Sequence, residues 1–437
     1  MTIRFTLAAS AIALLAAGPA SAQTEIQWWH AMGGALGEWV DDLAQGFNES
    51  QDEYVVVPTY KGSYPETMTA AIAAFRSGEQ PHIVQVFEVG TATMMAAEGA
   101  VYPVYQLMQD TGTPFDPSAY LPAVAGYYTT SEGEMLSLPF NSSTPVMYYN
   151  KDAFEAAGLD PESPPETWPE FAEAAAALVE SGATSCGFTT AWQEWVQLEN
   201  LSAWHNVPIG TLGNGFGGLG TELLLNSDLQ VMHISALKDW MDEGLFKYGG
   251  RQGSAEGLFF SGECGLSFSS SAAYAGIAAN AGFDFGIGML PYWPDVEGAP
   301  QNSIIGGGTL WVLQGRDEED YAGVAEFFNY LSSPEVQADS HARTGYLPIT
   351  TAAYELAQER GLYEERPGFD TSIRQLTLNP PTENSKGLRF GNYVQIREII
   401  NEELEAVWAG DKEPQAALDA IVERGNELLR QFEEAHS

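Results

Sequence analysis

Apolar residues in the first hundred positions alternate between strand-like runs and helix-like spacing. Short apolar runs at residues 26–29, 54–57 and 83–87 predict three strands. One face of a helix between the first two strands is predicted by Leu36, Val40, Leu43 and Phe47. A second helix is expected at residues 68–76, with Gly78 as its C-cap. This β-α-β-α-β order predicts a parallel sheet covered by helices.

A second region of the same kind begins near the middle of the chain. Residues 146–150 form a strand-like run that leads into a short helix ended by Gly158. Thr167 is placed to cap a helix over residues 168–178, whose early proline is tolerated in a first turn. Further strands are expected within residues 258–271 and at residues 309–313.

The last third of the chain has mainly helical spacing. Helices are predicted at residues 321–331, 334–344, 394–408 and 414–432. Two α/β regions followed by a long helical tail indicate two lobes, one of them completed by chain that returns late. We find no internal repeat and no low-complexity linker, so strand-like crossovers are expected to join the lobes.

The first 22 residues have the pattern of a secretory signal. Arg4 precedes an apolar run over residues 5–17, and Ala20-Ser-Ala22 supplies the small residues of a cleavage site. The run is shorter than the roughly 20 residues of a spanning helix. We therefore expect cleavage after Ala22 and a free periplasmic protein. No cysteine near the cleavage point offers a site for a lipid anchor.

Composition indicates a large, strongly acidic globular protein. The chain has 437 residues, 45% of them hydrophobic, which argues against disorder. Its 18 basic and 59 acidic residues give a net charge of −41, and loss of Arg4 with the signal gives 17 − 59 = −42. Such a charge repels nucleic acids and anionic lipids, so neither is expected as a partner. The simplest explanation of this negative charge is a solvated acidic surface that keeps the protein soluble.

Two cysteines, Cys186 and Cys264, are expected in an oxidising compartment. Neither belongs to a CxxC or metal-type spacing. The sequence leaves open whether they are bridged or are buried free thiols, because it does not place the two sulfur atoms.

Catalytic and cofactor motifs are weak. Residues 213–218 (GNGFGG) match GxGxxG by letter but lack the strand before and the helix after that a dinucleotide site needs, so a loop is expected. The histidines show no zinc-type pairing, and GxSxG is absent from the sequence. Paired carboxylates are too abundant in this chain to identify a hydrolase. We expect no enzyme activity, no cofactor and no metal.

Polar and aromatic residues instead gather near the ends of the predicted strands, where open α/β sheets place their ligands. The candidate ligand-binding residues are Tyr64, Glu88, Ser143, Trp192, Trp195, Ser270, Gly307, Tyr346 and Arg397. The arginine and the two tryptophans could also have purely structural roles, without contact to a ligand. Arg397 is followed by Glu398, Glu402 and Glu403, which suit a surface ion pair, and the tryptophans suit core packing.

Five segments carry a family resemblance: VPTYKG, EVGTATMM, PFNSSTPV, YYNKDAF and QLEN, at residues 57–62, 88–95, 139–146, 148–154 and 197–200. Over residues 28–432 the chain resembles the periplasmic sn-glycerol-3-phosphate-binding proteins of ABC importers. The resemblance implies an α/β periplasmic-binding-protein fold of the maltose-binding-protein type, with two discontinuous lobes, a ligand cleft and hinge crossovers. Expected boundaries are residues 23–138 plus 286–335 for one lobe and 139–285 plus 336–437 for the other.

The same resemblance implies that all the candidate residues except the two tryptophans match ligand-binding positions. Arg397 would hold phosphate oxygens with its planar fork of donors, and Glu88 would accept from glycerol hydroxyls. The sequence leaves open whether Ser270 or Ser271 contacts the ligand. Flat tryptophan rings would cover the carbon skeleton or cage a quaternary ammonium, which admits glycerophosphocholine as a ligand.

We therefore expect a monomeric capture protein for a small organophosphate, which hands its ligand to ABC permease subunits at the inner membrane. Two alternatives remain. Aromatic rings and carboxylates also suit a binding protein for a neutral sugar or oligosaccharide. A secreted hydrolase would need a catalytic carboxylate pair or metal cluster, and fold alone does not decide function.

Overall fold

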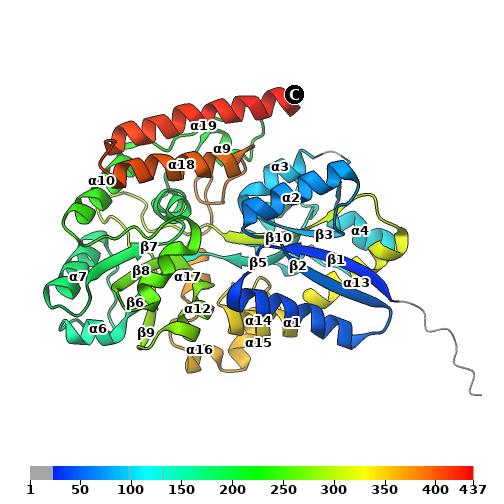
Figure 1. Ribbon diagram of the computed structural model, residues 1–437, viewed down its shortest axis with the longest axis horizontal. Helices are drawn as coiled ribbons and strands as arrows, with labels where there is room; N and C mark the ends of the chain where they lie inside the picture. Colours follow the sequence, from blue (N-terminus) through cyan, green and yellow to red (C-terminus); the bar gives the residue numbers. More distant parts are fainter. Residues whose placement is uncertain (1–22, 98, 131, 437) are drawn as a thin grey trace, which may run out of the picture.

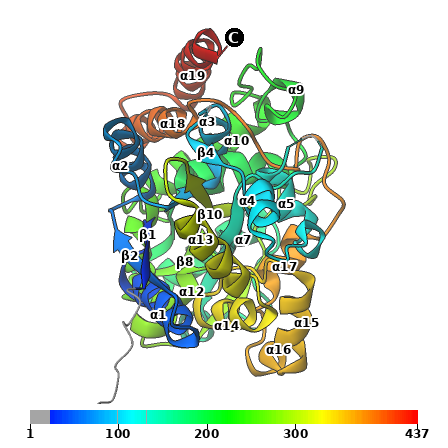
Figure 2. The same cartoon turned by 90° about the vertical axis from the view of Figure 1, so that its right-hand side faces the viewer.

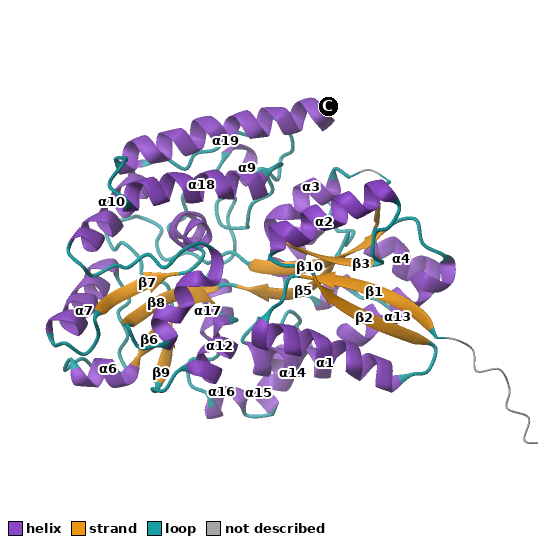
Figure 3. Ribbon diagram, viewed as in Figure 1, coloured by secondary structure: helices purple, strands orange, loops and turns teal. Residues whose placement is uncertain are grey.

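The computed structural model of the chain describes residues 23–97, 99–130 and 132–436. Two β-sheets lie beside each other, and helices cover both (Figures 1 and 3). The expected signal segment and its cleavage point after Ala22 lie outside the described residues. Within the described part of the chain, no helix is both long and apolar enough to cross a membrane.

The larger sheet combines parallel and antiparallel pairing. Its six strands are β1 (Thr24–His30), β2 (Tyr54–Tyr60), β3 (Ile83–Phe87), β4 (Val101–Tyr102), β5 (Leu138–Ser143) and β10 (Gly306–Leu313). The order is β2-β1-β3-β10-β4, and β5 also pairs with β10. β1 runs parallel to β2 and β3, as predicted. β10 is antiparallel to its three partners, so the sheet as a whole is mixed.

Helices cover both faces of this sheet, with α2 above it and α1 below it in Figure 1. The helical elements of this part are α1 (Gly34–Ser50), α2 (Tyr64–Ser77), η1 (Glu88–Gly90), α3 (Thr91–Met95), α4 (Val104–Thr111), η2 (Pro117–Ala119), α5 (Pro122–Tyr128), α13 (Glu318–Leu331) and α14 (Pro334–Thr344). Val40, Leu43 and Phe47 of the predicted apolar face of α1 are buried. Gly78 ends α2 in the left-handed conformation, as expected for a C-cap.

The smaller sheet has the order β7-β8-β6-β9. Its strands are β6 (Pro145–Asn150), β7 (Cys186–Thr190), β8 (Cys264–Ser270) and β9 (Phe285–Gly288). Cys186 and Cys264 are opposite each other in the parallel pair β7–β8 and form a disulfide. The bridge therefore joins two adjacent strands of one lobe and leaves the other lobe unconstrained.

The remaining helices surround the smaller sheet. They are α6 (Lys151–Ala156), α7 (Trp168–Glu180), η3 (Trp195–Asn200), α8 (Leu201–Trp204), α9 (Thr211–Asn214), α10 (Asp228–Asp242), η4 (Gln252–Ala255), α11 (Glu256–Phe260), α12 (Ala273–Asn280), α15 (Thr351–Glu359), α16 (Leu362–Glu365), α17 (Thr371–Leu376), α18 (Tyr393–Trp408) and α19 (Pro414–His436). Thr167 caps α7, as predicted. The last two helices lie side by side at the top of Figures 1 and 2, so the chain does return late to this lobe.

The strand predicted within residues 258–271 is correct only for its second half. Phe259 and Phe260 belong to α11, and strand β8 begins at Cys264. A short apolar pair fits a helix or a strand equally well by spacing. Gly262, at φ 73°, turns the chain between the two elements. The loop expected at residues 213–218 is confirmed, because Leu212 and Gly213 break α9 with left-handed backbone angles.

Three short crossovers connect the two sheets. β5 leads into β6 through Thr144 alone. The Thr144 hydroxyl donates to Ser303 Oγ at 2.6 Å, on the segment that leads into β10. The third crossover contains Leu347, whose amide donates to the Ser142 carbonyl at 2.8 Å. Relative to the expected boundaries at 139 and 286, β5 (Leu138–Ser143) still belongs to the larger sheet, β9 (Phe285–Gly288) belongs to the smaller one, and the larger sheet resumes at β10 (Gly306–Leu313).

Candidate functional site

A cavity of about 590 Å³ lies between the two sheets, beside the crossovers. It is lined by Tyr64, Glu88, Ser143, Trp192, Trp195, Ser270, Gly307, Tyr346 and Arg397. These nine residues are all of the candidates from the sequence. They come from both lobes, so the fold brings together side chains that are more than 300 positions apart.

Strand ends position the residues on the larger-sheet side. Gly307 has φ 86°, and a Cβ there would overlap the carbonyl oxygen of Asn141. Only glycine therefore lets β10 approach β5 this closely. The Asn141 side chain is oriented by Gln85, which donates to Oδ1 at 2.8 Å, and it donates in turn to the Tyr64 hydroxyl at 2.8 Å.

Two buried tyrosines form the rigid part of the cavity wall. The Tyr64 ring stacks on Phe87 at 5.2 Å, and the Tyr346 hydroxyl contacts Met32 Sδ at 3.4 Å. Burial raises the pKa of Tyr346 to about 12 and that of Tyr64 well above its ordinary value. Both hydroxyls therefore stay protonated at neutral pH and remain available as hydrogen-bond donors.

Arg397 is the central charge of the site. It is only 5% exposed and projects from α18. Its Nε and Nη2 donate to the two carboxyl oxygens of Glu199 at 2.9 and 2.7 Å, and Nη2 also donates to Glu88 Oε1 at 2.6 Å. Nη1 donates no hydrogen bond to any of the described residues. The alternative interpretation of Arg397, a surface ion pair with a glutamate of the same helix, is wrong. Glu398 pairs instead with Arg251. Glu402 and Glu403 both pair with Arg424.

Burial and charge oppose each other in this cluster. Burial raises the pKa of Glu88 to about 7, although Arg397 counteracts it. Burial also disfavours the Arg397 charge, but Glu199 and Glu88 outweigh this effect and raise the pKa of Arg397 above its usual range. Arg397 therefore stays charged, while Glu88 is close to the midpoint of its titration at neutral pH. The cross-lobe pair Arg397–Glu88 joins η1 of one lobe to α18 of the other.

Both tryptophans lie in unusual backbone. Trp192 has φ 49°, which is rare for a large side chain, and its amide donates to the carbonyl of Gln252 at 2.9 Å. Trp195 begins a π-helical segment, η3, that ends at Asn200 and contains Glu199. Strained residues and π-helical turns concentrate at functional sites in proteins. Here they turn the two rings toward the cavity and Glu199 toward Arg397.

The structure separates the two serine candidates. Ser270 lines the cavity, and its Oγ accepts from the Ala272 amide at 3.1 Å. Ser271 is buried at 5% exposure and does not line it. Ser270 is therefore the residue that faces the cavity.

Three carboxylates of the site, Glu66, Glu199 and Glu256, were missed in the sequence. Glu199 is fully buried and holds Arg397, and Glu256 lines the cavity from α11. Glu199 lies in the QLEN segment, which carried a family signal without indicating a role. Glu256 offered no signal, because it is one of 59 acidic residues in the chain.

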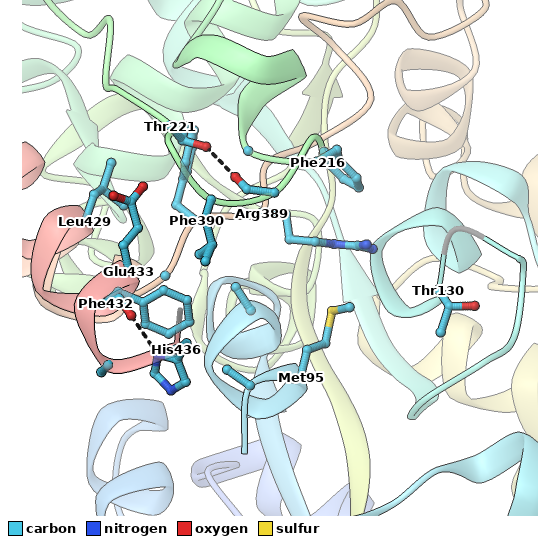
Figure 4. Close-up of a pocket in the computed structure, with 17 residues that line it drawn as sticks. Met95, Thr130, Phe216, Thr221, Arg389, Phe390, Leu429, Phe432, Glu433 and His436 are labelled. Atoms are coloured by element: carbon cyan, nitrogen blue, oxygen red, sulfur yellow. Dashed lines mark hydrogen bonds between the residues drawn. The ribbon is translucent and has the colours of Figure 1, made fainter. Parts of the chain in front are cut away.

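A larger hollow of about 1000 Å³ lies between α3 and the end of α19, and none of the nine candidates lines it. Figure 4 shows its mainly apolar wall with Met95, Phe216 and Phe432. Two of its polar side chains, Arg389 and His436, have contacts within the protein, although the buried Nε of Arg389 has no hydrogen-bond partner among the described residues. Arg389 Nη2 donates to the carbonyls of Gly126, Tyr127 and Thr129, and its guanidinium lies 4.5 Å from the centre of the Phe216 ring. His436 Nδ1 is 2.7 Å from the Phe432 carbonyl oxygen (Figure 4).

The cavity beside the crossovers is the better candidate site, because all nine candidate residues line it around the buried Arg397. In the part of the chain that is described, no group of three or more His, Cys, Asp or Glu side chains is arranged to hold a metal ion. The arrangement offers reversible binding of a polar ligand: two lobes, one buried cation, several hydroxyl donors and flat rings.

Comparisons with known proteins agree with this geometry. The chain is 53% identical over 427 residues to the sn-glycerol-3-phosphate-binding periplasmic protein UgpB of Yersinia pseudotuberculosis, covering 98% of this chain and 97% of that one. It is 51% identical over 434 residues to the protein of the same name in Escherichia coli K12, covering 99% of each chain.

Solved structures share the fold at low sequence identity. UgpB from Mycobacterium tuberculosis in complex with glycerophosphocholine has a TM-score of 0.78 at 22% identity, covering 94% of this chain and 99% of that one. The maltose/maltodextrin-binding domain MalE from Bdellovibrio bacteriovorus, bound to maltotriose, has a TM-score of 0.72 at 17% identity, covering 93% and 100%. The expected fold of the maltose-binding-protein type is confirmed.

The family model of bacterial extracellular solute-binding proteins matches residues 42–370. An extracellular family agrees with the expected export of the chain. With this match and with relatives above 50% identity over nearly the whole length, the chain belongs to the bacterial extracellular solute-binding protein family.

Proposed function

We propose that the chain is the periplasmic substrate-binding component of an ABC importer and captures sn-glycerol-3-phosphate and glycerophosphodiesters such as glycerophosphocholine. The observation that carries the proposal is the convergence of all nine candidate residues on one cavity around a buried arginine. The curated relatives named for glycerol-3-phosphate binding support the ligand class. A monomer that delivers its ligand to the permease subunits completes the proposal.

Arg397 serves as the phosphate anchor in this proposal. Glu199 holds Nε and Nη2 in a bidentate pair, which fixes the guanidinium plane, and Nη1 remains free to donate to a phosphate oxygen. The hydroxyls of Ser143 and Tyr346 and the Gly307 amide complete the donor set. Because the whole chain is strongly anionic, these few directed donors must recognise the phosphate against the overall field.

Glu88 changes partner in the proposed binding step. A phosphate oxygen that accepts a hydrogen bond from Arg397 Nη2 replaces the Glu88 carboxylate there, and Glu88 then accepts from the glycerol hydroxyls. The Glu88–Arg397 contact crosses between the lobes, so the ligand bridges the same two elements. Closure of the lobes about the three crossovers would exclude water and strengthen these hydrogen bonds.

Isothermal titration calorimetry tests the proposal. We expect glycerol-3-phosphate and glycerophosphocholine each to bind with a stoichiometry of one per chain. Maltotriose is the control for a neutral-sugar binder, which the carboxylates and tryptophans would also suit. Binding of maltotriose without binding of either phosphate compound would overturn the ligand class and leave the family unaffected.

A further inference from the structure

Two buried amide side chains lie behind the wall of the smaller cavity. Gln85 in the middle of β3 and Asn141 in β5 are both 0% exposed, and neither of them lines the cavity. Both form hydrogen bonds to other side chains. A buried amide whose oxygen and nitrogen both have partners has a fixed orientation, because turning it over would place donor against donor.

A glycine on the intervening strand makes room for the contact between these two amides. Gly308 lies on β10, which pairs with both β3 and β5. A Cβ at this position would lie 2.9 Å from Asn141 Oδ1 and 3.3 Å from Gln85 Cγ. A larger residue would therefore push the two side chains apart, whereas glycine lets them meet across the strand.

A backbone amide sets the direction of the hydrogen bonds. The Ala31 N–H, which only donates, donates to Gln85 Oε1 at 2.8 Å. The Gln85 nitrogen therefore faces Asn141 and donates to its Oδ1 at 2.8 Å. The Asn141 nitrogen in turn donates to the Tyr64 hydroxyl oxygen at 2.8 Å. Since this oxygen accepts from Asn141, the hydrogen of the Tyr64 hydroxyl is directed toward another acceptor.

The hydrogen bonds end at two tyrosines that line the cavity, Tyr64 and Tyr346. The Tyr346 hydroxyl also interacts with Asn141 and with Tyr64, and both interactions partly offset the burial that raises its pKa. It donates to Met32 Sδ at 3.4 Å, but a thioether sulfur is a weak acceptor. An anionic oxygen of a ligand is a stronger acceptor for hydroxyls of this wall.

We propose that Gln85 and Asn141 are positioning residues, which fix the hydroxyls of Tyr64 and Tyr346 as donors toward an anionic oxygen of the ligand. This inference rests on the proposed function, because the ligand must supply the oxygen that accepts from these hydroxyls. The direction of the donors is set before binding, so the ligand does not have to reorient them. Such preorganisation increases affinity without any contact between the ligand and the two amides.

A double-mutant cycle tests the proposal by calorimetric titration with glycerol-3-phosphate. Asn141→Ala in the otherwise wild-type chain should weaken binding by about five- to tenfold, as for the loss of one to two hydrogen bonds. The same substitution in a chain that carries Tyr64→Phe and Tyr346→Phe should weaken binding by less than about twofold, because the hydroxyls that Asn141 positions are gone. A general structural loss would be similar in the two backgrounds.

Gln85→Met provides a second, independent cycle. Methionine fills a similar volume but donates no hydrogen bond, so the Asn141 amide is free to turn over. We expect binding about fivefold weaker in the wild-type background and less than about twofold weaker without the two hydroxyls. If Asn141→Ala does not fold, this cycle decides alone.

Asn150→Ala is the matched control. Asn150 is also a buried asparagine, and its Oδ1 caps α6 of the other lobe by accepting from the Ala153 amide at 2.9 Å. It does not line the cavity, so this variant should bind glycerol-3-phosphate within about twofold of the wild type. A thermal melt of each variant verifies folding.

The possible results separate the two proposals. The positioning role is overturned if substitution of Asn141 or Gln85 weakens binding by the same factor in both backgrounds, or leaves the affinity of the otherwise wild-type chain unchanged. A wild-type chain that does not bind glycerol-3-phosphate would instead overturn the proposed function itself.

Discussion

The two hollows between the lobes differ in size and in chemistry. Size would favour the larger hollow as the ligand site, whereas chemistry favours the smaller cavity. The larger one, about 1000 Å³, is lined mainly by apolar side chains, and Arg389 in its wall is held by three backbone carbonyls. The smaller one, about 590 Å³, contains Arg397 with a free Nη1 and carboxylates without full compensation. Arg389 also has a buried Nε without a partner among the described residues, so the distinction between the hollows is the set of nine candidate residues that lines the smaller cavity around Arg397.

The largest expected effect comes from removing the central charge of the smaller cavity. Arg397→Ala should weaken glycerol-3-phosphate binding at least about 30-fold, in line with the 2–5 kcal/mol lost when one member of a buried charge pair is truncated. It should also lower the free energy of unfolding by about 3–5 kcal/mol, because Glu199 and Glu88 lose their partner. Calorimetry and urea unfolding measure the two quantities.

Arg397→Lys separates charge from geometry in the same position. Lysine keeps the positive charge but loses the planar fork that Glu199 orients, so binding should remain weaker than in the wild type. Arg389→Lys in the larger hollow is the control and should leave affinity unchanged. Equal losses at positions 397 and 389 would remove the distinction between the two hollows.

A smaller effect is expected from the buried carboxylate behind the smaller cavity. Glu194 is 3% exposed, its Oε2 has no hydrogen-bond partner among the described residues, and burial raises its pKa from 4.5 to about 7. Protonation therefore contributes stability fully below pH 4.5, and this contribution is lost as the pH rises through about 7. Glu194→Gln, which stays neutral, should stabilise the protein by about 3 kcal/mol at pH 8 and change little below pH 4.5.

Glu433→Gln provides the comparison from the larger hollow. Glu433 pairs with Arg430 at 3.0 Å and accepts from the Gly220 amide, so its charge is already compensated. This substitution should change the free energy of unfolding by less than about 1 kcal/mol. Denaturant unfolding across the pH range would contradict the account if Glu433→Gln gave the larger stabilisation at pH 8.

A single hydroxyl should have a modest effect. Tyr346→Phe keeps the contact of the ring with Trp39 but removes a donor that faces the cavity. Loss of one hydrogen bond corresponds to about 1 kcal/mol, or roughly fivefold in affinity for glycerol-3-phosphate. Titration calorimetry that shows an unchanged dissociation constant would exclude this hydroxyl from the binding contacts.

The smallest effect is expected in the apolar wall of the larger hollow. Met95 is 37% exposed and lines that hollow. Met95→Ser makes the wall more polar without touching the smaller cavity, so affinity for glycerol-3-phosphate should stay within about twofold of the wild type. A tenfold change in calorimetry would show that the larger hollow takes part in binding.

Hydrophobic spacing predicted α1, because burial of one helix face imposes the period, and an apolar run predicted the fully buried strand β3. α14 was predicted from its start at Ser333-Pro334 and its end at Gly345. Strand β5 was missed, since its sequence LPFNSS contains a proline and small polar residues and lacks a β-branched run. Its place in the sheet depends on pairing with β10, more than 160 residues away, which local pattern does not encode.

Seven of the nine candidate residues were chosen because the family resemblance over residues 28–432 implies ligand-binding positions there. All nine line one cavity. What sequence reasoning lacked was the electrostatic environment: that Glu199 holds Arg397, that Glu88 joins it across the lobes and that Glu256 has no cation. These facts depend on burial and on contacts between distant segments, so a chain with 59 acidic residues does not reveal them.

A crystal structure of the protein with bound glycerol-3-phosphate tests the central claim most directly. The account predicts density for one ligand in the smaller cavity, with a phosphate oxygen within about 3 Å of Arg397 Nη1 and a glycerol hydroxyl at Glu88. Ligand density at Arg389 in the larger hollow, with the smaller cavity unchanged, would contradict it.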